Sequence, residues 1–233
     1  MKTKFNILFK FPAVNLIFLL VITALFFKVM KSNSRMETDL DKYMPQNHPA
    51  FVYSDKAEAM FNIKDGIIIA IENKNGIYNA GTLQKIRDIT RKLGKMPEID
   101  KGDVTSLYTA DNIIGSESGM DVKAFYKKVP DSSEKLEILK QNVRNNEMVF
   151  GRLVSDDETV SVIVANIEDD VFSQEFYHRI LDLTKSYEGP ERIYVAGTPI
   201  VEGTMAYLGP KDMKKMVPIV IIVIIIVLLF VMR

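Results

Sequence analysis

Two long apolar stretches stand near the ends of the chain, and a stretch of mixed composition lies between them. The first runs from Phe11 to Met30, and the second, rich in Ile and Val, runs from Val217 to Met232. A helix that crosses a bilayer needs about 20 mostly apolar residues. The first stretch reaches this length, whereas the second falls a few residues short before Arg233. The pattern predicts two membrane spans in a fragment of a longer chain.

A cleaved signal peptide is the alternative interpretation of the first stretch. Lys2, Lys4 and Lys10 precede it, like the basic start of a secretory signal. The apolar stretch is long for such a signal, and Val29-Met30-Lys31 is not a cleavage site of small residues. We therefore expect an uncleaved anchor. Basic residues flank both sides of the two stretches, so their charges do not fix the orientation.

The intervening residues show the hydrophobic periods of an α+β domain. The expected strands are Gly66–Glu72, Asp103–Tyr108, a hairpin of Met148–Ser155 and Thr159–Ile167, and Ile193–Ala196. The expected helices are Ala50–Phe61, Asn79–Lys95, one after Pro130 capped by Asp131 and Glu134, Val171–Tyr187 and Ile200–Leu208. Without an irregular insertion at Thr109–Pro130, the order is βαββαβ, the ferredoxin-like pattern.

The expected core and segment boundaries follow from this order. The buried set should include Ile67, Ile69, Leu83, Ile86, Val162, Val164, Phe176 and Ile180. The predicted segments are a cytoplasmic tail at 1–10, a membrane helix at 11–30, a linker at 31–49, an extracytoplasmic domain at 50–208, a basic interfacial segment at 209–216 and a second membrane helix at 217–233.

Composition excludes several classes of function. The 30 basic and 30 acidic residues balance, so nucleic acid is a poor candidate partner. The chain has no cysteine, which excludes disulfides, thiolate metal sites and cysteine nucleophiles. It also lacks the GxSxG, P-loop and GxGxxG motifs. We expect no enzyme activity, no catalytic residue and no cofactor.

Three acidic clusters and two histidines are the candidates for metal binding. They are Asp156-Asp157-Glu158, Glu168-Asp169-Asp170, the alternating Glu37, Asp39 and Asp41, and the separate His48 and His178. None has the spacing of a calcium loop or a zinc site. We interpret the clusters as a solvated hairpin turn, a helix start and an exposed segment, and expect no metal. Lys211, Lys214 and Lys215 are interpreted as an interfacial anchor, with lipid phosphate contact as the alternative.

Five short stretches, in this order, resemble the resistance–nodulation–division (RND) transporter superfamily, and within it the MMPL-type exporters. They are Tyr43–Pro49, Val104–Leu107, Gly151–Asp157, Gly197–Ile200 and Asp212–Pro218. The resemblance implies a first span, a porter-type extracytoplasmic domain and the start of a second span in a plasma or inner membrane. It also implies a lipid, hydrophobic or amphiphilic substrate, and it assigns no substrate path.

The resemblance further implies that other spans complete the transporter, with a homo-oligomer left open. In the family, acidic residues on later spans couple transport to protons. Neither apolar stretch here contains Asp or Glu, so we expect this chain alone to be inactive. Two alternatives remain open: the extracytoplasmic ligand-binding region of a two-span sensor, and a membrane-tethered scaffold.

Overall fold

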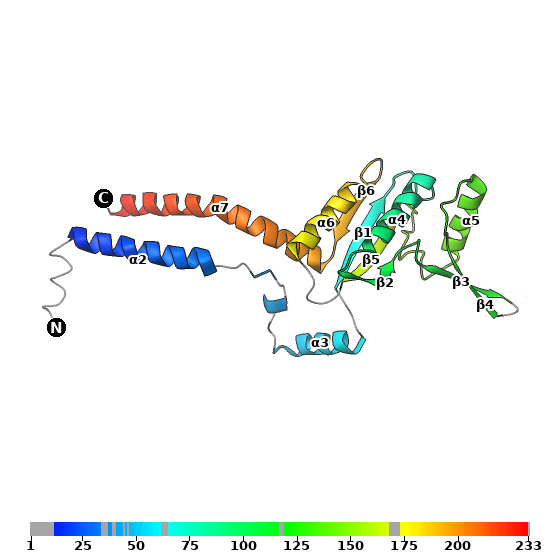
Figure 1. Cartoon of the computed structure of the whole chain (residues 1–233), viewed down its shortest axis with the longest axis horizontal. Helices are drawn as coiled ribbons and strands as arrows, with labels where there is room; N and C mark the ends of the chain where they lie inside the picture. Colours follow the sequence, from blue (N-terminus) through cyan, green and yellow to red (C-terminus); the bar gives the residue numbers. More distant parts are fainter. Residues whose placement is uncertain are drawn as a thin grey trace. The chain divides into compact units, whose positions relative to one another are not determined.

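The computed structural model describes residues 12–33, 37–38, 41–43, 45, 47–61, 65–116, 119–167 and 173–232 (Figure 1). The chain separates into two units, Met1–Glu37 and Thr38–Arg233. The first unit contains helix α2, Pro12–Asn33. The second contains the short 3-10 helix η1, Asp41–Tyr43, and helix α3, Pro49–Phe61, ahead of the sheet domain. The predicted helix at Ala50–Phe61 is therefore confirmed.

Helices α2 and α7 are both long and apolar enough to cross a bilayer. Helix α7 covers Thr198–Val231 without a break. The short helix expected at Ile200–Leu208 is thus the start of one longer helix, which continues through residues 209–216 and the apolar residues that follow them. An interior proline removes one hydrogen bond and commonly bends a helix. Pro210 and Pro218 lie inside α7, but the remaining hydrogen bonds carry the helix through both positions.

Four strands form the central sheet, in the order β2-β5-β1-β6. They are β1, Gly66–Glu72; β2, Ile99–Thr105; β5, Val160–Ile167; and β6, Arg192–Ala196. Every neighbouring pair is antiparallel. Helix α4, Ala80–Leu93, connects β1 to β2, and α6, Gln174–Lys185, connects β5 to β6. Each connection passes over one intervening strand, and the domain is α+β as predicted.

Local signals in the sequence explain where these two helices begin. The side chain of Asn79 accepts a hydrogen bond from the Thr82 backbone N–H at 2.9 Å, and Ser173 does the same for Phe176 at 3.1 Å. Such caps satisfy the free N–H groups of the first turn. The predicted faces are buried: Leu83, Ile86, Phe176 and Ile180 are fully enclosed together with Ile67 and Ile69.

The prediction for strand β5 had the correct period but the wrong face. Ile163 and Ala165 are buried, whereas Val162 and Val164 are only half-buried. The strand starts at Val160, and its buried face begins with Ser161, whose hydroxyl donates to the Leu153 carbonyl at 3.2 Å. This hydrogen bond allows the polar Ser161 to be buried. Because successive side chains of a strand point to opposite faces, Val162 and Val164 then point to the open face.

Three further predictions are corrected between β2 and β5. Residues 148–155 form turns and isolated bridges instead of a strand, and Gly151 has φ +75° there. The insertion at 109–130 contains a hairpin of β3, Asp111–Ser116, and β4, Gly119–Ala124. Helix α5, Ser133–Arg144, is capped by Ser132 rather than Asp131. Asp131 instead pairs with Lys135 one turn later, at 2.7 Å.

Candidate functional site: the open sheet face and its junction with helix α7

One face of the sheet packs into the core and the opposite face stays partly open. Register pairs Ile68 with Val164 and Ala70 with Val162, so these four apolar side chains share the open face. Ile68 is 41% exposed, and the other three are half-buried. We call these four residues the open-face stripe. An apolar surface of this kind fits a hydrophobic ligand or another domain.

A polar edge borders the open-face stripe on the side of β6. Tyr194 is paired with Ala70 in the register and is 51% exposed. Its hydroxyl donates a hydrogen bond to the Glu72 carboxylate at 2.9 Å. The face therefore combines apolar side chains with a phenol and a carboxylate. That combination is suited to an amphiphilic contact, since it offers an apolar centre with few polar groups beside it.

Strand β6 passes directly into helix α7 at Gly197. This residue has φ +123°, a conformation that side-chain-bearing residues rarely adopt. A Cβ added here would overlap the carbonyl oxygen of Gly66, at the start of β1. The first turns of α7 are partly buried, at Pro199, Ile200 and Gly203. The sheet and the membrane helix are thus joined without a flexible linker.

Helix α6 holds the first part of α7 through polar and aromatic contacts. The Gln174 side chain donates to the Gly203 carbonyl at 3.3 Å, and the hydroxyls of Tyr177 and Thr204 lie 2.9 Å apart. The His178 ring stands edge-on to Tyr177, with ring centres 5.1 Å apart. It stands similarly against Tyr207, at 5.2 Å. His178 is therefore part of the junction between domain and helix.

A hollow of about 560 Å³ lies beside the loops that follow β1 and precede β5. Glu158 borders it, at φ +60°, and is 8% exposed. Its carboxylate accepts hydrogen bonds from Arg144 at 2.5 Å and Lys140 at 2.8 Å. Burial alone would raise the pKa of Glu158, but these two cations outweigh it and leave the pKa below its ordinary value. This ion-pair cluster ties α5 to the turn before β5.

The same hollow is bordered by Tyr78. Its hydroxyl is buried without a hydrogen-bond partner among the described residues. Burial raises the pKa of Tyr78, and the negative charge of Glu158 adds to the effect. The phenol therefore stays protonated and offers a donor. The hollow also contains the carboxylates of Glu137 and Asp157, so its polar lining has no single sign of charge.

The structure places the candidate residues from the sequence in different environments. Asp156 and Asp157 are exposed at the turn as predicted, whereas Glu158 was wrongly assigned to a solvated turn. Glu168-Asp169-Asp170 and Asp39 lie outside the described residues, and Glu37 is exposed. His48 accepts a hydrogen bond from the Ala50 N–H at 3.3 Å, at the start of α3. Lys211 lies over the Tyr207 ring at 5.8 Å, and Lys214 and Lys215 are exposed.

Sequence reasoning missed a buried carboxylate next to β6. Glu191 is 4% exposed and accepts hydrogen bonds from Thr82 at 2.8 Å and Lys85 at 2.5 Å. Burial would raise the pKa of Glu191, but the bonds from Lys85 and Thr82 leave it lowered. The partners are more than 100 residues away along the chain, so no local pattern could reveal them. The cluster ties α4 to the turn before β6.

None of these clusters resembles a metal centre. Among the described residues, no group of three or more His, Asp or Glu side chains is placed to hold a metal ion. A comparison with curated proteins finds no match. The family model of the MMPL family matches residues 42–233, which include α3, the sheet domain and α7. The chain therefore belongs to the MMPL family of RND-type membrane transporters.

Proposed function

We propose that this chain contributes two membrane spans and a porter-type domain to a proton-driven exporter of lipids or other hydrophobic or amphiphilic molecules. The observation that carries the proposal is the open-face stripe in a chain of the MMPL family. The stripe offers apolar side chains on a rigid sheet, and a weakly selective lipid path needs such a surface. The junction at Gly197 would transmit movement between this surface and α7.

The strand order supports a ferredoxin-like core for the proposed porter domain. Both helix connections pass over one antiparallel strand, as in the split βαβ motif. The hairpin of β3 and β4, together with α5, is then an insertion between the second and third strands of that motif. An experimental structure with another strand order would contradict this assignment.

A photoreactive fatty acid tests the lipid path. The full chain in nanodiscs is irradiated with a diazirine-bearing palmitate, and adducts are located by mass spectrometry. We expect labelling at Ile68 and Tyr194, and we expect Val164→Asp to reduce it severalfold because a carboxylate opposes apolar binding. An imposed proton gradient should leave labelling unchanged, since neither apolar stretch contains Asp or Glu.

Val122→Asp provides the matched control for this experiment. Val122 is also a strand valine, 54% exposed, but it lies in the β3–β4 hairpin. It should leave labelling of the sheet face unchanged. Labelling confined to α2 and α7, or an equal loss in both variants, would refute the lipid path. Labelling that requires a proton gradient would instead refute the claim that coupling groups lie on other spans.

We also propose that the sheet domain faces away from the cytoplasm. The chain has no natural cysteine, so one introduced cysteine reports on one position. Ser133→Cys, at the exposed first position of α5, should react with a membrane-impermeant maleimide in intact cells. Lys4→Cys in the basic N-terminal tail should react only after lysis. The reverse pattern would invert the proposed topology.

A further inference from the structure

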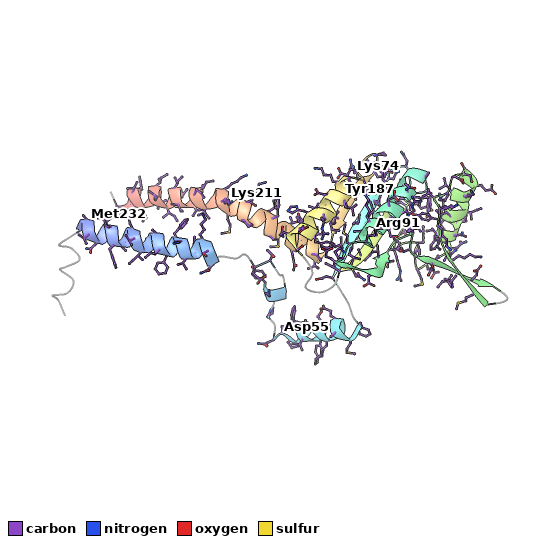
Figure 2. All side chains as sticks on the ribbon, viewed as in Figure 1. Asp55, Lys74, Arg91, Tyr187, Lys211 and Met232 are labelled. Atoms are coloured by element: carbon purple, nitrogen blue, oxygen red, sulfur yellow. The ribbon has the colours of Figure 1, made fainter. Side chains whose placement is uncertain are left out.

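Helix α3 carries an apolar stripe whose large side chains are exposed. At about 100° per residue, one side of Pro49–Phe61 collects Ala50, Tyr53, Ala57, Met60 and Phe61. We call these five residues the α3 stripe. Tyr53 is 68% exposed, Met60 77% and Phe61 72%. None of the residues of α3 is buried, and its side chains stand out all round, including the labelled Asp55 (Figure 2).

Such a helix requires a partner surface to be stable. Isolated helices shorter than about 12–15 residues are marginal in water, and α3 has 13 residues. Its side-chain hydrogen bonding is local, with Ser54 donating to Glu58 at 3.2 Å. Large aromatic side chains gathered on one exposed side mark a contact surface. The chemistry of the stripe and its place in the chain then decide which surface it meets.

Helix α3 lies in the sequence between the two helices that are long and apolar enough to cross a bilayer. Fifteen residues, 34–48, separate it from α2, and four residues, 62–65, separate it from β1. Gly66, which starts β1, lies against Gly197, which precedes α7. The link from Phe61 to Gly66 spans at most about 18 Å. The helical rise from Gly197 to the basic residue Lys211 is roughly 21 Å. The stripe can therefore reach the level of the lipid headgroups, whose layer is itself several ångströms thick.

We propose that the α3 stripe lies in the headgroup region of the bilayer that α2 and α7 enter, on the side that carries the sheet domain. Tyrosine suits this region because its ring is apolar and its hydroxyl stays hydrated. Lys56 lies beside the stripe, with its ammonium 5.6 Å from the Tyr53 ring centre. Its long stem lets the charge reach lipid phosphates.

Apolar burial rather than net charge carries this contact. The charged residues of α3 are Asp55, Lys56 and Glu58, so the helix has one net negative charge and anionic lipids gain no overall attraction. Opposite the stripe, Asp55 and Glu58 alternate with Phe51, Val52 and Ala59. The affinity of so short a stripe is weak, but α3 is tethered to a membrane span, which keeps its local concentration at the surface high. Anionic lipid content and salt should therefore have little effect. The inference holds whichever molecule the transporter moves.

Single tryptophans test the proposal, because the chain has none of its own. Tyr53→Trp and Phe61→Trp place the probe on the stripe, and Asp55→Trp places it about 200° from Tyr53, on the other side of the helix. The full chain is reconstituted in phosphatidylcholine with or without brominated acyl chains near the headgroup. We expect brominated lipid to remove roughly half or more of the stripe emission, as for a side chain inserted 5–10 Å. Brominated lipid should leave the emission of Asp55→Trp unchanged, and iodide in the aqueous phase should quench it.

Ile224→Trp, in the middle of the apolar part of α7, shows that the reconstitution succeeded. Its emission should be quenched by bromine placed deep in the acyl chains. Given that control, stripe tryptophans that iodide quenches and bromine does not would overturn the proposal. Shielding from both quenchers would also overturn it, because α3 would then pack on protein, such as the open sheet face or a second copy.

Discussion

Gly197→Ala should destabilise the sheet domain by more than about 3 kcal/mol, and the variant should fail to accumulate in membranes. Two costs add at this position. The backbone has φ +123°, where a side chain is strained by about 1–3 kcal/mol. The added Cβ would also overlap the carbonyl oxygen of Gly66 and lie 3.3 Å from the Cα of Ile67. Neither neighbour can move aside, because both belong to the central strand β1.

Gly102→Ala is the control that separates strain from overlap. Gly102 has φ +108°, but a Cβ added there meets nothing within 4 Å. It should cost only the strain, about 1–3 kcal/mol. Unfolding of both variants is followed by circular dichroism in the same detergent. If Gly197→Ala were no less stable than Gly102→Ala, β6 and α7 would not be joined by the close backbone approach described above.

Ile163→Ala should cost about 2–5 kcal/mol of stability, whereas Val162→Ala, one residue earlier, should cost less than about 1 kcal/mol. Ile163 is fully buried in the hydrophobic core, and its truncation leaves a cavity. Val162 points to the open face, where water can fill the space left by the lost methyl groups. Urea unfolding of the two variants under identical conditions measures the difference.

A greater loss of stability for Val162→Ala than for Ile163→Ala would mean that β5 presents its other face to the core. It would restore the face assignment expected from the alternation of valines in the sequence, and the open-face stripe would then belong to the core. The proposed lipid surface depends on this assignment. The comparison therefore tests the structural basis of the proposed function without any transport measurement.

Elements whose signals are local could be predicted from the sequence. The two apolar stretches identified both helices that are long and apolar enough to cross a bilayer, since that property depends on length and composition alone. Helix α4 followed from its hydrophobic period, and β1 from its run of isoleucines. The family followed from short motifs spread along the chain and was confirmed over residues 42–233.

Features that depend on partners far along the chain could not be predicted in this way. The buried state of Glu158 needs Lys140 and Arg144 on α5, and that of Glu191 needs Lys85 on α4. A carboxylate in a turn is usually exposed to solvent. Burial of its charge is unfavourable unless cations such as these pair with it.

By itself, the sequence determined the two long apolar helices, the period of strand β5 and the α+β class, because these rest on residues within one element. It also carried the family motifs, including the glycine at 197. Only the tertiary structure decided which side of β5 faces the core. Alternation defines two faces but does not rank them. The hydrogen bond from Ser161 to Leu153 lets a polar residue face inward, and Val162 and Val164 are left on the open face.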